Sequence, residues 1–178
     1  NRRSMMSLMA TALVAPIAGA STAPRIVATT RLLADCAQRL CGAEVTALIP
    51  PGTHVQSYRP SRADAALLAQ ADLVLWHGPQ VETELASHLA RLPQNRPAVT
   101  LGTADRWPEL LPAHRAETVA ALAAALAAQL PQLAIRSAEQ ATRLADELSA
   151  LDARCAALLA EVAQDRRLLV TASPALTA

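Results

Sequence analysis

The stretch Pro50–Asp64, Pro-Pro-Gly-Thr-His-Val-Gln-Ser-Tyr-Arg-Pro-Ser-Arg-Ala-Asp, decides how the rest of the chain is interpreted. It follows an apolar run, Glu44–Ile49, which predicts a strand. Ser61 is a typical N-cap of a helix, and Asp64 at the third helical position favours the positive end of the helix dipole. Three polar side chains alternate within the loop: His54, Gln56 and Tyr58. A polar loop after a buried strand is where open α/β sheets place ligands.

The composition indicates one domain with a core of aliphatic side chains. The 178 residues are 52% hydrophobic but only 2% aromatic, with no Phe, so the core must consist of Leu, Val and Ala. A net charge of +1 gives no electrostatic case for nucleic acid as a partner. Cys36 and Cys41 lie about 140° apart around a predicted helix. We therefore interpret them, and Cys155, as small buried apolar residues rather than as a disulfide or metal site.

Residues 1–23 have the pattern of an export signal. Arg2 and Arg3 form a basic start, Met5–Ala18 is apolar, and small residues at 18–23 offer cleavage sites. The paired arginines also resemble a twin-arginine signal. The sequence thus predicts a periplasmic or otherwise exported protein, with an uncleaved membrane anchor as the alternative.

Strand-like and helix-like segments alternate after the signal. The predicted strands are Arg25–Thr30, Glu44–Ile49, Asp72–Trp76 and Pro97–Leu101. The predicted helices between them are Arg31–Cys41, which Gly42 ends, Ser61–Gln70 and Val81–Leu92. This alternation predicts an α/β fold with a parallel sheet. Right-handed crossovers would place the strand-to-helix loops at one edge of that sheet.

The last third of the chain predicts two helices and a strand. Ala113–Leu130 is an Ala-rich helix that Pro131 ends, and Ser137 with Gln140 forms a capping box for Ala138–Ala163. That second helix would be about 39 Å long. Its predicted apolar face consists of Ala141, Leu144, Leu148, Leu151, Cys155, Leu158 and Val162. Arg167–Ala172 predicts another strand.

Two segments resemble signatures of the metal-specific substrate-binding proteins of ABC importers, the zinc and manganese receptors. The first signature reads roughly Gly-x-Asp-Pro-His-x-Tyr-x-Pro-x-x-x-Asp, and its matches here are Gly52, Tyr58, Pro60 and Asp64. The ligating histidine of that signature falls on Gln56. The second signature is matched at Ala71, Asp72, Gly78 and Glu82, with His77 in place of the usual Asn.

The other ligand positions implied by the resemblance also carry different residues. The second falls on Trp107, beside matches at Asp105, Leu110 and Pro112, and the third falls on Ser173. Zinc prefers imidazole, thiolate or carboxylate, and an indole offers only an N–H donor. The three family ligand positions present in this chain are therefore occupied by an amide, an indole and a hydroxyl.

Displaced side chains offer another way to hold a metal. His54 and His77 both follow predicted strands at the ligand edge, and Asp105 and Glu109 lie on the next loop. Two imidazoles, a carboxylate and water would suit zinc or manganese. The alternative is that His54 is a solvated loop residue and His77 a hydrogen-bonded strand-end residue. Tyr58 and Trp107 would then face an organic ligand or pack between lobes.

The resemblance implies the first lobe of a two-lobed solute-binding protein. Its parts would be a signal peptide at 1–23, an N-terminal α/β lobe at 24–133, a long connecting helix at 134–165, and the first strand of a truncated second lobe at 166–178. Such a protein captures a metal ion, or a diverged small solute, and delivers it to an ABC permease in the membrane.

Other classes are less well supported by the motifs. A non-metal-binding accessory or partner-binding protein is the alternative. The other signature residues of the receptors are present in this chain, but the metal-ligand positions carry different residues. No Gly-rich turn follows the first strand, and neither a P-loop nor a nucleophile motif is present, so we do not expect an enzyme.

Overall fold

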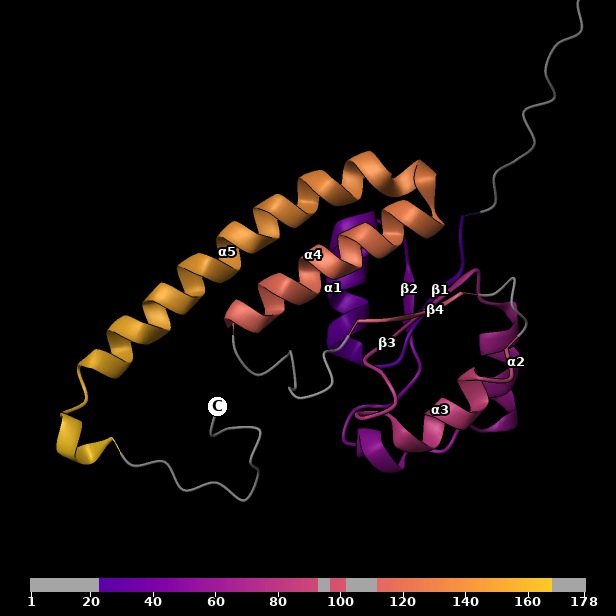
Figure 1. Ribbon diagram of the computed structural model, residues 1–178, viewed down its shortest axis with the longest axis horizontal. Coiled ribbons are helices and arrows are strands. Elements are labelled where there is room, and N and C mark those ends of the chain that lie inside the picture. Colours follow the sequence, from indigo (N-terminus) through magenta and orange to yellow (C-terminus); the bar gives the residue numbers. More distant parts are fainter. Residues whose placement is uncertain (1–22, 93–96, 102–111, 168–178) are drawn as a thin grey trace, which may run out of the picture.

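Four short parallel strands form the centre of the fold in the computed structural model, which describes residues 23–92, 97–101 and 112–167 (Figure 1). The strands are β1 (Ile26–Ala28), β2 (Val45–Ala47), β3 (Leu73–Trp76) and β4 (Ala98–Thr100). Their order is β2-β1-β3-β4, and every pair is parallel. The predicted parallel α/β fold is confirmed, and each strand lies within its predicted range.

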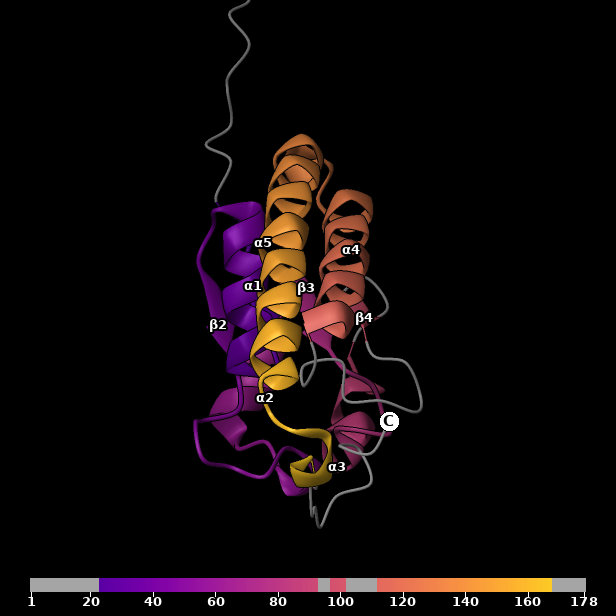
Figure 2. The same cartoon turned by 90° about the vertical axis from the view of Figure 1, so that its left-hand side faces the viewer.

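Helices cover both faces of this sheet. They are α1 (Arg31–Cys41), α2 (Arg62–Gln70), α3 (Thr83–Leu89), α4 (Pro112–Gln129) and α5 (Ala134–Ala160), with short 3₁₀ turns η1 (Val55–Ser57), η2 (Pro131–Leu133) and η3 (Gln164–Arg166). Figures 1 and 2 show α1, α4 and α5 together on one side and α2 and α3 on the other. The described part of the first lobe therefore has three layers, with a core on each face of the sheet.

The alternation of side chains along the strands builds these two cores. In β3, Leu73 and Leu75 join the core under α1, α4 and α5, whereas Val74 and Trp76 join the core under α2 and α3. All four residues are buried because the sheet is covered on both faces. The near-continuous apolar strands seen in the sequence follow from this double cover.

Local signals fix the ends of the first two helices. Thr30 caps α1, accepting a hydrogen bond from Leu33 N, and Gly42 ends it by donating its N–H to Gln38 O. Ser61 and Asp64 form a reciprocal capping box at the start of α2. The predicted caps Gly42 and Ser61 are confirmed, whereas the cap by Thr30 is a finding of the structure.

The start of the longest helix differs from the prediction. The helix α5 begins at Ala134, directly after η2, and Leu133 at its N-cap offers no side-chain hydrogen bond. Ser137 lies inside the helix, where its Oγ donates to Ala134 O at 3.1 Å. The predicted capping box of Ser137 and Gln140 is therefore wrong. Ser137 is completely buried, because the α4–α5 hairpin packs tightly around it.

The second half of α5 is exposed from Ser149 onward in the described part of the chain. Leu144 and Leu148 are buried, but Leu151, Leu158, Leu159 and Val162 are 42%, 56%, 64% and 39% exposed. Figure 1 shows this half extending past the sheet and its covering helices. The predicted apolar face is thus buried only in its first half. The expectation that every cysteine is buried holds for Cys41 only: Cys36 is half-buried, and Cys155 is exposed on this same half of α5.

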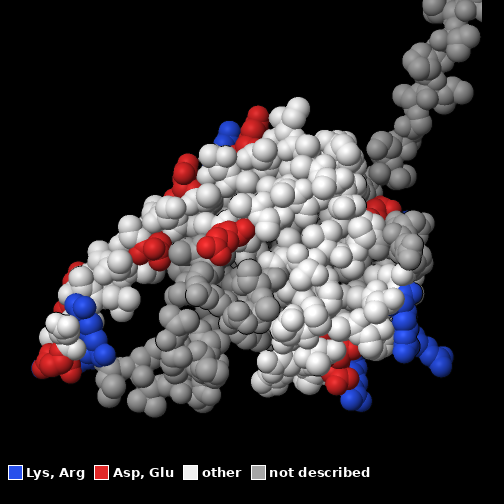
Figure 3. All heavy atoms as spheres, viewed as in Figure 1, with Lys and Arg blue, Asp and Glu red and all other residues white. Residues whose placement is uncertain are grey.

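Charged side chains are sparse on the face of the molecule drawn in Figure 3, and both signs occur there. Exposed acidic and basic residues gather at the far end of α5, at Glu161, Asp165, Arg166 and Arg167. Among the described residues, no helix has both the length and the apolar character that a membrane span requires. The predicted signal at 1–23, apart from Ala23, and the predicted strand at 167–172, apart from Arg167, lie outside the described residues.

Candidate functional site at the carboxyl edge of the sheet

Three strand-to-helix connections leave the sheet at the same edge. The strands β2 and β3 both pair with β1 in parallel, so the segments that follow all three strands emerge together. The helix α1 covers one face and α2 the other, which makes the boundary between β1 and β3 the point where the chain changes direction. Open α/β sheets bind ligands at such a point. The predicted convergence is confirmed for these three loops, and residues 102–111 after β4 lie outside the described part.

A buried carboxylate joins the ends of β1 and β3 at this edge. Glu82, at the start of α3, is fully buried. Its Oε2 accepts hydrogen bonds from His77 N at 2.8 Å and Gly78 N at 3.1 Å. Its other oxygen, Oε1, accepts a hydrogen bond from Thr29 Oγ1. One side chain therefore satisfies three donors from two neighbouring strand ends.

The imidazole of His77 belongs to the same polar cluster. It is 3% exposed, and its Nε2 lies 3.2 Å from Thr30 Oγ1. The same hydroxyl caps α1, so the imidazole connects the end of β3 to the start of that helix. In this structure His77 is a hydrogen-bonded strand-end residue, and its role as a metal ligand stays a prediction.

The protonation of Glu82 depends on two opposing effects. Burial raises the pKa of its carboxyl group. The hydrogen bond from Thr29, the attraction to His77 and the hydrogen bonds from the Gly78 and His77 amides lower the pKa but offset burial only in part. A buried carboxyl group of the protein itself thus lies between the ends of β1 and β3.

The loop after β2 is tied to the start of α2 through Tyr58. The phenol donates a hydrogen bond to Asp64 Oδ2 at 2.7 Å, and that oxygen also accepts one from Ser61 N at 2.8 Å. The ring is half-buried against the core under α2 and α3. The signature residues Tyr58 and Asp64 therefore hold the loop in place, whichever ligand the loop faces.

We predict that the Tyr58 phenol titrates far above an ordinary tyrosine. Burial, the hydrogen bond to Asp64 and the Asp64 charge raise its pKa to about 12. Because Tyr58 is the single tyrosine of the chain, the phenolate absorbance of the whole protein reports this one group. In the variant Asp64→Ala the midpoint should fall towards 10, the ordinary value for tyrosine, whereas Asp35→Ala should leave it unchanged. A wild-type midpoint near the ordinary value would contradict the hydrogen bond.

The hydrogen bond has a consequence for stability at alkaline pH. The folded protein retains the phenol proton at pH values where the unfolded chain has released it. The free energy of unfolding should therefore fall as the pH rises from about 10 towards about 12.

Gly78 is a position where a side chain cannot be added without strain. Its φ is +120°, and a Cβ there would lie 3.0 Å from Thr100 Cγ2. We expect Gly78→Ala to lower the free energy of unfolding by about 1–3 kcal/mol, measured by urea denaturation. The control is Gly52→Ala, where φ is also positive but no atom lies within 4 Å of the added Cβ. Equal effects of the two substitutions would show that the contact with Thr100 does not matter.

The structure places the predicted ligand residues in different surroundings. His54 and Gln56 are exposed in the loop after β2, whereas His77 is buried after β3. The strands β2 and β3 are separated by β1, so their ends lie about 10 Å apart. The remaining candidates, Asp105, Trp107, Glu109 and Ser173, lie outside the described residues. Within the described ranges, no three His, Cys, Asp or Glu side chains gather closely enough to hold a metal ion.

The sequence alone did not assign roles to Thr29, Thr30 or Glu82. Thr30 directly precedes a helix, and the preference of threonine for N-caps was a usable local signal. The hydrogen bond between Thr29 and Glu82 joins residues 53 positions apart, and no local pattern indicates it. The polar cluster at the edge is therefore a finding of the structure.

Comparison with known proteins identifies similar chains along almost the whole sequence after the predicted signal. Residues 26–178 match the family model described as ZnuA, zinc-uptake complex component A, periplasmic. The manganese-binding lipoprotein MntA of Bacillus subtilis is 26% identical over 168 residues, which cover 85% of this chain and 55% of that protein. The iron-binding protein YfeA of Yersinia pestis is 34% identical over 80 residues, which cover 43% of this chain and 26% of that protein.

Solved structures share the fold. The Mn-bound periplasmic metal binding protein from Candidatus Liberibacter asiaticus matches with a TM-score of 0.75 at 18% identity, covering 86% of this chain and 63% of that one. The periplasmic zinc binding protein TroA from Treponema pallidum matches with a TM-score of 0.74 at 24% identity, covering 84% of this chain and 60% of that one. The chain thus spans between half and two thirds of the length of MntA and of these two structures.

Proposed function

Because the chain belongs to the ZnuA family of periplasmic zinc-uptake components, we propose that it captures a metal ion outside the cytoplasmic membrane and delivers it to an ABC permease. The match over residues 26–178 is the observation that carries this proposal. The family consists of transport receptors and is not a family of enzymes. Zinc or manganese is the proposed solute, since relatives are named for manganese, iron and zinc.

The chemistry of the carboxyl edge supports a cation over an anion. Strand-end amides commonly bind anions, but here the N–H groups of His77 and Gly78 already donate to Glu82. An anionic solute would have to displace this buried carboxylate. A metal cation would instead be attracted by its negative charge.

The proposed arrangement follows the family outline. Residues 1–23 direct export, 24–133 form the first lobe, 134–165 form the connecting helix, and 166–178 start the second lobe. The single helix α5, 27 residues long and packed on the first lobe through Leu144 and Leu148, supports the role of a rigid connector.

We propose that His54 and His77 provide the imidazole ligands on this lobe. Both follow strands at the ligand edge, and His54 is exposed on the loop after β2, the strand that pairs with β1. His77 would exchange its contact with Thr30 for the metal. The other ligands would come from outside the described part of the chain.

Calorimetric titration of the chelator-treated protein with Zn²⁺ and with Mn²⁺ tests both metal capture and the two proposed histidine ligands. We expect one ion to bind per chain, and His54→Ala or His77→Asn to weaken binding by at least about tenfold. His88→Ala, a substitution of a histidine on α3, is the matched control. Metal binding of unchanged affinity in both histidine variants would refute His54 and His77 as ligands, but it would not contradict metal capture. No binding of either metal would refute metal capture.

The second candidate is an accessory or partner-binding protein that keeps the receptor frame without its metal. It is favoured by the exposed amide of Gln56 at the first family ligand position and by the lack of a three-residue ligand group in the described ranges. The outcome without metal binding would support it.

A further inference from the structure

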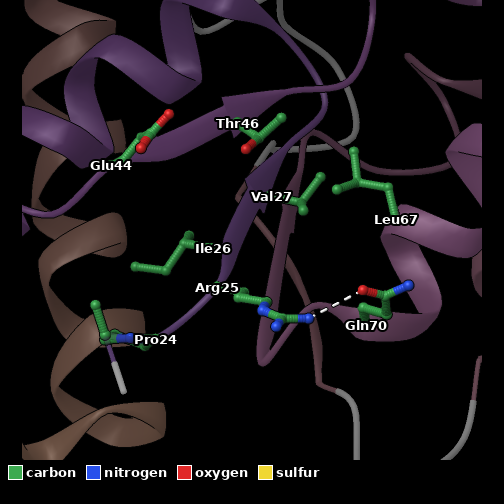
Figure 4. A pocket seen from close by; sticks show the side chains of 9 residues that line it. Pro24, Arg25, Ile26, Val27, Glu44, Thr46, Leu67 and Gln70 are labelled. Carbon is green, nitrogen blue, oxygen red and sulfur yellow. Dashed lines mark hydrogen bonds between the residues drawn. The ribbon is translucent and has the colours of Figure 1, made fainter. Parts of the chain in front are cut away.

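A cavity of about 420 Å³ opens at the other edge of the sheet, beside the amino ends of β1 and β2. This volume lies within the range of small-molecule sites. The cavity is lined by Ala23, Pro24, Arg25, Ile26, Val27, Glu44, Thr46, Leu67 and Gln70, which Figure 4 draws around it. Because parallel strands have all their carboxyl ends at one edge, this cavity is separate from the candidate metal site.

The cavity carries two opposite charges that do not neutralise each other. Arg25 and Glu44 both line it, yet they form no ion pair, and the side chain of Glu44 has no hydrogen bond within the described part of the chain. Both side chains are exposed. Each charge therefore remains able to bind a ligand group of the opposite sign.

Arg25 is held in position for such a role. Its Nη1 donates to Gln70 Oε1 at 2.9 Å, drawn as the dashed line in Figure 4, and its backbone N donates to Asp72 Oδ2 at 2.9 Å. A guanidinium has five N–H donors in a rigid fork, and the bond to Gln70 uses one of them. The others suit a carboxylate, which arginine can bind through two parallel hydrogen bonds.

One apolar side chain lines the cavity together with the charged groups. Leu67 from α2 is half-buried at the wall, whereas Ile26 and Val27 are each 1% exposed and present almost no side-chain surface to a ligand. Leu67 can accommodate hydrocarbon, and Arg25 and Glu44 can bind the charged groups of the same ligand. The site is thus complementary to a small molecule with a carboxylate, an ammonium group and an apolar part.

We propose that this cavity binds a free α-amino acid, with its carboxylate on Arg25 and its ammonium group on Glu44. The site is independent of metal capture at the opposite edge. Substitutions in it should leave the binding of Zn²⁺ and Mn²⁺ unchanged.

Calorimetric titration of the full chain with glycine, L-glutamine and L-leucine tests the proposal. We expect at least one of them to bind with a Kd below about 1 mM. For L-leucine, the matched probes are isopentylamine, which lacks the carboxylate, and 4-methylpentanoate, which lacks the ammonium group. Each should bind at least about tenfold more weakly than L-leucine, because a charge-assisted hydrogen bond is lost. Failure of all three amino acids to bind would overturn the proposal, as would equal binding of the single-charge probes.

Two substitutions test whether the amino acid binds in this cavity. Glu44→Gln and Arg25→Gln should each weaken amino-acid binding by at least about tenfold. Glu139→Gln and Arg154→Gln, exposed positions on α5, are the matched controls and should leave it unchanged. Since the Glu44 side chain makes no hydrogen bond in the described part, its variant should fold normally even if Arg25→Gln does not. Unaltered binding in Glu44→Gln would overturn the proposal.

Discussion

Glu82→Ala is expected to lower the free energy of unfolding by about 3–5 kcal/mol. The substitution removes the acceptor of three hydrogen bonds, from Thr29, His77 and Gly78, in a position that water does not reach. Each donor left without a partner costs the desolvation of a buried polar group. Urea denaturation followed by circular dichroism measures the loss.

A neighbouring glutamate on the same helix serves as the control. Glu84 forms an exposed ion pair with Arg59 at 3.0 Å, and such pairs contribute about 0–1 kcal/mol. Glu84→Ala should therefore have a small effect. A similarly small effect of Glu82→Ala would contradict the role of Glu82 in joining β1 to β3.

The raised pKa of Glu82 gives this site an unusual dependence on pH. Because burial raises the pKa in the folded protein, the folded state retains the proton after the unfolded chain has released it. The contribution of Glu82 to the free energy of unfolding therefore decreases as the pH rises from about 4.3, the ordinary value for glutamate, to the raised value. In Glu82→Gln this contribution is absent, so the difference in stability between wild type and variant should shrink over the same range.

Leu144→Ala is expected to lower the free energy of unfolding by about 2–5 kcal/mol, whereas Leu158→Ala should change it by less than about 0.5 kcal/mol. The two leucines lie 14 positions apart on one face of α5, but Leu144 is 5% exposed and Leu158 is 56% exposed. Deleting a packed side chain leaves a cavity, and deleting a solvated one does not. The urea midpoints of the two variants compare the effects directly in the same chain.

This comparison tests whether the helix is anchored only through its first half. A cost for Leu158→Ala close to that for Leu144→Ala would mean that a further part of the chain, or a partner, covers the second half of α5.

Much of the first lobe could be predicted from local sequence. Residues that prefer strands predicted β1 and β3 within their observed ranges. Gly42 predicted the end of α1, and Ser61 with Asp64 predicted the start of α2. Caps and turns depend on groups within four residues of one another, so the sequence contains the whole interaction.

Predictions that depended on the surroundings of a residue were less successful. Ser137 and Gln140 match a capping box, but η2 passes directly into α5 and places Ser137 inside the helix. Cys155 and Leu158 match an apolar face, yet they are exposed because α5 extends past the sheet. Periodicity shows which side of a helix is apolar, but it does not show how far along the helix a neighbour extends.

The sequence by itself determined the parallel α/β fold, the family and the edge of the sheet at which His54 and His77 emerge. Only the tertiary structure decided that Glu82 joins Thr29 to His77 and Gly78, and that Arg25 and Glu44 line one cavity. The physical reason is that a helix cap satisfies neighbouring groups of the same segment, whereas a buried carboxylate takes its donors from whichever strand ends the order β2-β1-β3-β4 brings beside it.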